Sequence, residues 1–97
     1  MTKGTHAEVG SKELLQLQSE LISLSTALKD CYEFVENNIK ALNEEWRDAK
    51  FDEFEDSFRS RKDQIMELSE KYYNWATQYL QQRIEDVLEI ENSKTSM

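Results

Sequence analysis

Apolar residues recur along the chain at alternating spacings of three and four, in two separate runs. This spacing is typical of amphipathic helices that pair in the manner of a coiled coil. The first run skips only Asn38 and the second skips only Arg61. The first run consists of Leu14, Leu17, Leu21, Leu24, Leu28, Cys31, Val35 and Leu42, and the second of Phe51, Phe54, Phe58, Ile65, Leu68, Tyr72, Trp75 and Tyr79. The pattern predicts two long helices.

The two runs differ in rotational phase. Leu42 ends the first run and Phe51 begins the second, nine residues later. At about 3.5 residues per turn, this offset would place the runs on opposite sides of one continuous helix. A reversal near Asp48 lets them face each other. We therefore expect an all-α chain folded as an antiparallel two-helix hairpin. A single long rod with a separate partner at each end is the alternative.

The expected boundaries follow from helix-capping residues. Helix is predicted over about 11–46 and 49–92, because proline is absent and glycine occurs only at Gly4 and Gly10. The turn between the two helices is predicted at about 46–50. Ser11 and Asp48 are the expected N-caps, and Trp46 is expected beneath the bend. Residues 1–10 and 93–97 are expected to be disordered tails.

Further apolar residues, spaced by seven, lie beside the two main runs. They are Tyr32, Ile39 and Trp46 in the first helix and Met66, Tyr73, Leu80 and Val87 in the second. Soluble monomers rarely leave a large contiguous apolar surface in water, so this surplus predicts a partner. A second hairpin, giving a four-helix bundle, is the simplest one. A single helix with a wide apolar stripe is the alternative.

Charge and residue inventory disfavour several function classes. The formal net charge is −8, and no cluster of Lys and Arg stands clear of acidic residues, which disfavours binding to nucleic acid or to anionic lipid. No apolar run approaches the roughly 20 residues that span a bilayer. Cys31 is the only cysteine and lies within an apolar run, so we expect it to be structural. We expect no enzyme activity, no catalytic residue and no cofactor.

Three acidic residues near the predicted turn form a ridge along the second helix. Asp48, Asp52 and Asp56 follow one another at helical steps of four. They lack the glycine-containing loop of a calcium site, and we expect no metal. The ridge is interpreted as a solvated face, with contact to a basic partner as the alternative.

The turn carries a motif that resembles the WXG-type family, the helical hairpins of type VII (ESX) secretion systems. In that family a Trp-x-Gly at the bend precedes a large aromatic residue. Here Trp46-Arg47-Asp48 is followed by Phe51 and Phe54, with Asp48 in place of the glycine. The resemblance covers about residues 14–90. It implies a dimer of hairpins, formed with itself or with a related hairpin or the N-terminal region of a secreted effector.

The family's export signal is Tyr-x-x-x-Asp/Glu after the second helix. It has no match near the C-terminus, because the residue four positions after Tyr79 is Arg83 and not Asp or Glu. The resemblance then implies an adaptor or chaperone whose partner supplies the signal. We expect the partner interface to include Tyr32, Ile39, Met66, Tyr73, Leu80 and Val87. The expected location is the cytoplasm, with export without a cleaved signal peptide as the alternative. The other functional hypothesis is a structural coiled-coil scaffold unrelated to secretion.

Overall fold

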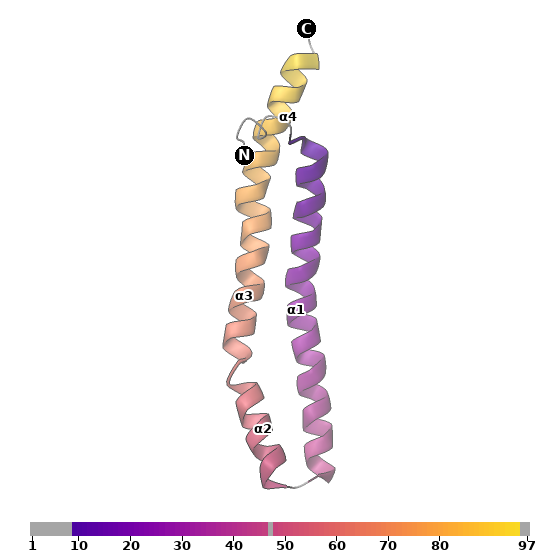
Figure 1. Cartoon of the computed structure of the whole chain (residues 1–97), viewed down its shortest axis with the longest axis vertical. Coiled ribbons are helices and arrows are strands. Elements are labelled where there is room, and N and C mark those ends of the chain that lie inside the picture. The colour runs from indigo at the N-terminus through magenta and orange to yellow at the C-terminus, as the bar shows by residue number, and fades with distance from the viewer. Residues whose placement is uncertain (1–8, 47, 96–97) are drawn as a thin grey trace. The chain divides into compact units, whose positions relative to one another are not determined.

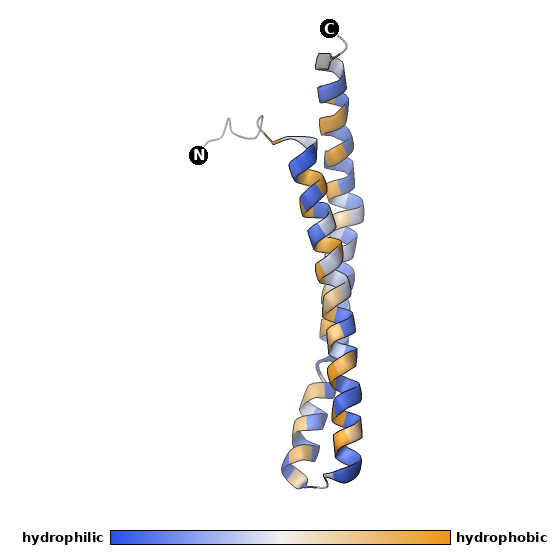
Figure 2. Cartoon of the chain, turned by 90° about the vertical axis from the view of Figure 1, so that its right-hand side faces the viewer, coloured by the Kyte–Doolittle hydropathy of each residue, from blue (hydrophilic) through white to orange (hydrophobic). Residues whose placement is uncertain are grey.

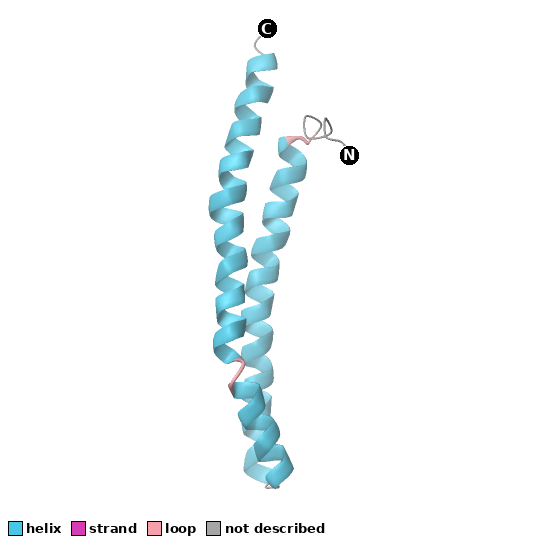
Figure 3. Ribbon diagram, turned by 60° about the vertical axis from the view of Figure 1, so that its left-hand side comes forward, coloured by secondary structure: helices cyan, strands magenta, loops and turns pink. Residues whose placement is uncertain are grey.

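The structure is a computed structural model that describes residues 9–46 and 48–95. Helices α1 (Ser11–Glu45), α2 (Ala49–Arg59), α3 (Lys62–Asn74) and α4 (Gln81–Thr95) follow one another, with the π-helical segment η2 (Trp75–Leu80) between α3 and α4 (Figure 1). No strand occurs within these described residues (Figure 3). The prediction of an all-α fold is therefore confirmed.

Two compact units divide the chain, and α1 contributes to both. The turn unit is Leu24–Lys71, and the terminal unit is Met1–Ser23 with Tyr72–Met97. Apolar and polar residues alternate along the helices of both (Figure 2). None of the described helices is long and apolar enough to cross a membrane.

The turn unit is an antiparallel helical hairpin. Contacts join Ser25 to Ser69 and Asn43 to Glu55, so residues late in α1 meet residues early in the returning chain. Tyr32 and Ile39 form its buried apolar core, at 7% and 6% exposure. The hairpin prediction is confirmed, whereas a four-helix dimer stays a prediction.

Ser60 and Arg61 interrupt the second helix, which was predicted to be continuous. The amide of Arg61 donates to the carbonyl of Phe58 over a distance of 3.1 Å, which is a tighter turn than an α-helix. The Ser60 hydroxyl donates to the carbonyl of Ser57 at 2.7 Å. Serine side chains that bond nearby carbonyls in this way compete with the helical ladder. Arg61 is also the position that the apolar run skipped.

The terminal unit pairs the start of α1 with η2 and α4. Its core consists of Ala76, Leu80 and Ile84, which are at most 5% exposed. Glu91 of α4 accepts hydrogen bonds from both the amide and the hydroxyl of Ser11, at 3.0 and 2.8 Å. A carboxylate at a helix N-terminus is stabilising because the first amides lack partners within the helix.

Two predicted boundaries are corrected at the helix ends. Ser11 is the first helical residue and not the N-cap, because the carbonyl of Gly10 already accepts the amide of Leu14. The second helical stretch continues to Thr95, so Ser93–Thr95 are not part of a disordered tail. The predicted tails otherwise fall mostly outside the described residues, as does Arg47.

Candidate protein-interaction surface

Asp48 caps α2 at the predicted turn. Its backbone is extended, with φ −143° and ψ 145°, and its carboxylate accepts hydrogen bonds from the amide of Phe51 at 3.0 Å and from the indole of Trp46 at 2.9 Å. These two bonds, the indole first, lower the pKa of the Asp48 carboxyl. The predicted N-cap is confirmed at this residue.

Trp46 lies outside the hairpin, which corrects the expectation that it would be buried beneath the bend. Its side chain is 58% exposed and stacks on Phe51, with ring centroids 6.2 Å apart. Phe51 contacts Phe54 at 6.0 Å, and Phe54 contacts Phe58 at 6.2 Å. Phe54 is itself 51% exposed. The turn motif Trp46, Asp48, Phe51 and Phe54 is therefore a connected group on the surface of the turn unit.

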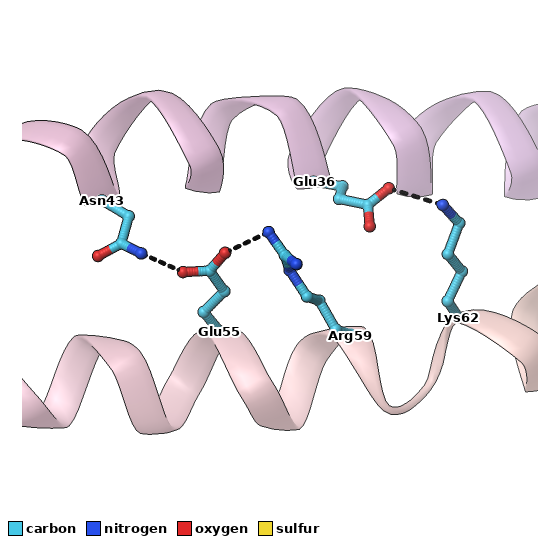
Figure 4. A network of polar contacts seen from close by, with 5 residues as sticks. All are labelled: Glu36, Asn43, Glu55, Arg59 and Lys62. Carbon is cyan, nitrogen blue, oxygen red and sulfur yellow. Dashed lines mark hydrogen bonds and ion pairs between the residues drawn. The ribbon is translucent and has the colours of Figure 1, made fainter.

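Polar side chains occupy the space between the two helices of the turn unit. Figure 4 shows Glu55, only 7% exposed, accepting a hydrogen bond from the amide of Asn43 and pairing with Arg59 at 2.6 Å. In the same view Lys62 donates to Glu36 at 3.1 Å. These contacts link α1 to both α2 and α3.

Two more polar contacts lie between the helices. The hydroxyl of buried Ser69 donates to the carbonyl of Ser25 at 2.6 Å. The Tyr32 ring stacks on Phe58, with centroids 4.3 Å apart, and its hydroxyl donates to the Phe58 carbonyl. Burial, with the nearby Glu36 carboxylate as a second cause, raises the pKa of the Tyr32 phenol. The side of α1 that faces the returning chain is thus partly polar.

The leucine run of α1 does not form the internal seam. Ser25, Tyr32 and Ile39 are buried, while Leu24, Cys31 and Leu42 are exposed. Neighbouring helical positions differ by about 100° at 3.6 residues per turn, so a shift of one position turns the leucine run toward the edge of the hairpin. Leu28 and Val35 stay half-buried between the two sides.

This arrangement leaves an apolar groove on the turn unit, of about 410 Å³. It is lined by Leu24, Ala27, Leu28, Cys31, Tyr32, Val35, Phe58 and Ile65. We call this set the leucine groove. Leu24, Leu28, Cys31 and Val35 belong to the first apolar run, which was predicted to lie inside the hairpin, and Phe58 and Ile65 belong to the second run.

The predicted partner residues divide into two groups. Tyr32, Ile39 and Leu80 are buried against other parts of the chain, at 5–7% exposure, and Tyr32 also lines the leucine groove. Met66 and Val87 are half-buried, and Tyr73 is 49% exposed. For all six residues, contact with a partner stays a prediction.

The buried polar residues were missed by the sequence reasoning. They carry a signal of their own, because Gln18, Ser25, Tyr32 and Ile39 are spaced by seven, as are Glu55, Lys62, Ser69 and Ala76. Heptad positions that hold polar or small residues are predicted to be solvent-exposed when apolar runs flank them. In the structure these two series are buried or half-buried.

No group of three or more metal-ligating side chains gathers among the described residues. The acidic ridge Asp48, Asp52 and Asp56 is exposed, and the Asp48 carboxylate is engaged in the cap. Comparisons with protein-family models, with characterised proteins and with solved structures give no match to this chain.

Proposed function

We propose that this chain is a non-enzymatic protein-interaction module that pairs with a second helical hairpin through the leucine groove. One observation carries the proposal. The hairpin of the turn unit encloses Ser25, Glu55 and Ser69, yet leaves Leu24 44% exposed and Cys31 exposed. A sequence that buries polar groups and exposes a contiguous apolar side has its apolar surface available for another chain.

The groove suits a helix as its occupant. Its walls are α1 and the antiparallel returning chain, which supplies Phe58 from α2 and Ile65 from α3. Amphipathic helices bind such grooves through residues at spacings of three and four. Leu24, Leu28, Cys31 and Val35 of the groove come from the leucine run, which has that spacing. A second copy of this chain therefore offers a compatible helix, and a four-helix bundle is the simplest assembly.

The turn motif gives the proposal a biological setting. Trp46 and Phe51 stack at the bend, and Asp48 starts the second helix as a cap. This arrangement supports a WXG-like role as a type VII secretion substrate, adaptor or targeting chaperone, paired with itself or with the helical N-terminal region of a secreted effector. The cytoplasm, or export without a cleaved signal peptide, is the setting that this role requires.

A scaffold that forms larger oligomers, unrelated to secretion, is the second candidate. Phe34 is 67% exposed and Leu15 is 47% exposed, and neither lines the leucine groove. Additional apolar contact points favour more than two copies per assembly. The mass of the assembly separates the two candidates.

Sedimentation of purified full-length chain tests the proposal. We expect a dimer for the wild type and a monomer for Leu24→Asp, because a carboxylate in the groove loses its hydration when a helix docks. Leu15→Asp is the matched control, since the two leucines are 47% and 44% exposed and only Leu24 lines the groove. Circular dichroism should show equal helicity in all three.

Equal mass for the two variants would contradict the groove as the interface. A wild-type mass above that of a dimer would favour the scaffold. A monomeric wild type would contradict self-pairing. Pull-down from the native host with wild type and Leu24→Asp would then ask whether a different helical chain binds at the groove.

A further inference from the structure

The π-helical segment η2 interrupts an otherwise α-helical stretch in the terminal unit. A π turn bonds each amide to the carbonyl five residues earlier, so it holds one residue more than an α turn. Side chains supply partners for two carbonyls here. Thr77 donates its hydroxyl to the carbonyl of Tyr73 at 2.9 Å, and Gln18 of α1 donates its amide to the carbonyl of Ala76 at 2.8 Å.

The buried residues that follow the π turn have an unusual spacing. Ala76, Leu80 and Ile84 are buried at successive steps of four, with Ala76 fully enclosed. A regular seam would continue from Ala76 to Arg83, seven residues on. The Arg83 side chain is instead 57% exposed and lies 3.7 Å from Asp86. The extra residue of the π turn thus replaces Arg83 by Ile84 on the buried side.

Gln18 contacts this segment at two points. Besides the Ala76 carbonyl, its amide lies 2.9 Å from the side-chain oxygen of Gln81, the first residue of α4. Gln81 in turn donates to Glu85 at 3.1 Å. One side chain of α1 therefore bonds both the π turn and the start of the helix after it.

We propose that Gln18 is the positioning residue that selects the π turn and so sets the rotational phase of α4. With the π turn in place, Ile84 faces inward and Leu88 and Ile90 stay exposed, at 38% and 58%. Loss of the Gln18 donor removes the side-chain hydrogen bond to the enclosed Ala76 carbonyl and favours an α turn, which would carry Arg83 toward the core. This inference goes beyond the proposed function, because it concerns the unpaired chain and requires no partner.

A double-mutant cycle tests the assignment. Deletion of exposed Gln78 removes the extra residue, so Ala76, Leu80 and Ile84 become spaced by three and four in a plain α-helix. We expect this deletion to keep the cooperative thermal transition. Deletion of exposed Glu20 from α1, which has no π turn to absorb the change, should abolish or strongly lower it.

Gln18→Leu is then combined with the Gln78 deletion. In the full-length chain this substitution should lower the Tm by roughly 5–10 °C, because a buried acceptor loses its donor. In the deletion background the shift should fall below about 2 °C. An equal shift in both backgrounds, or a Gln78 deletion no better folded than the Glu20 deletion, would overturn the proposal.

Gln18→Glu provides a second test of Gln18 as a hydrogen-bond donor, and this test does not depend on the deletions. An ionised carboxylate cannot donate to the Ala76 carbonyl, whereas a protonated one can. The pKa of such a group rises on folding, so its stabilising contribution is present at low pH and lost as the pH rises. We expect the Tm gap to wild type to be smaller at about pH 4 than at pH 7. A pH-independent gap, matching that of Gln18→Leu, would contradict the role of Gln18 as a donor.

Discussion

The side-chain amide of Asn43 in α1 donates a hydrogen bond to the carboxylate of Glu55 in α2, and Glu55 is only 7% exposed. The other carboxylate oxygen of Glu55 pairs with Arg59. Buried polar pairs of this kind are often neutral or unfavourable for stability, yet they restrict which registers a helix pair can adopt. The hypothesis for Glu55 is that it restricts the register of the helix pair in the turn unit.

Replacement of one member of the pair should cost more than replacement of both. We expect Glu55→Leu to lower the free energy of unfolding by about 1–3 kcal/mol, because Asn43 then keeps its buried amide without an acceptor. The double change Asn43→Leu with Glu55→Leu should recover most of this loss. Urea unfolding of the wild type, both single variants and the double variant measures the coupling. Additive losses would argue against a shared role.

The cap at Asp48 predicts an order of stabilities. Asp48→Ala should melt below Asp48→Gly, and Asp48→Gly slightly below the wild type, because glycine is a better N-cap than alanine. Thermal melts followed by circular dichroism give the order. A glycine variant that melts lowest would contradict the cap as the function of this residue.

The lowered pKa of Asp48 gives the same contact a pH signature. The folded pKa lies below the unfolded one, so the stabilisation is present above the unfolded value of about 3.9 and is lost as the pH falls through the folded value. The Tm difference between wild type and Asp48→Asn should therefore shrink between about pH 5 and pH 2. A constant difference over this range would argue against the charge-assisted bonds.

Tyr32 predicts the opposite behaviour at alkaline pH. Its folded pKa is raised, so its contribution is complete below the unfolded value of about 10 and is lost as the pH rises through the folded value. Tyr32→Phe should cost about 0.5–1.5 kcal/mol near neutral pH, through loss of the bond to the Phe58 carbonyl. Above about pH 10 the gap to wild type should narrow. Denaturant unfolding at neutral and alkaline pH measures both values.

Two isoleucines of α4 form a matched pair for the core of the terminal unit. Ile84 is 2% exposed and Ile90 is 58% exposed. We expect Ile84→Ala to cost about 2–5 kcal/mol and Ile90→Ala less than about 0.5 kcal/mol. Similar costs would contradict the phase of α4 described above.

The helical class and the reversal could be predicted because they depend on local features. The chain lacks breakers beyond Gly10, and the phase jump between Leu42 and Phe51 requires a bend that Asp48 can cap. The choice of internal face could not be predicted in the same way. Neighbouring faces of each helix are similarly apolar, so the sequence pattern does not distinguish which face is buried. The hydrogen bonds of Ser25, Ser69 and Glu55 favour one face, and they form only when the helices meet.

Two interruptions of the second helix were also beyond the pattern. Ser60 and Arg61 are compatible with helix, and their turn is marked by a side-chain bond to the Ser57 carbonyl. The π turn at Trp75–Leu80 depends on Gln18, nearly 60 residues earlier. Long-range contacts of this kind leave no local periodicity to read. The leucine groove was likewise not predicted, because Leu24, Leu28, Cys31 and Val35 were assigned to the interior of the hairpin.

The turn at Ser60 and Arg61 has a consequence for the order in which the molecule opens. It leaves α2 as an isolated segment of 11 residues between two non-helical points, with Glu55 as its buried side chain. Helices of this length are marginal in water without support from neighbouring elements. We therefore expect the amides of α2 to exchange with solvent together, and before those in the middle of α1, so that the end of the hairpin carrying Trp46 loosens first.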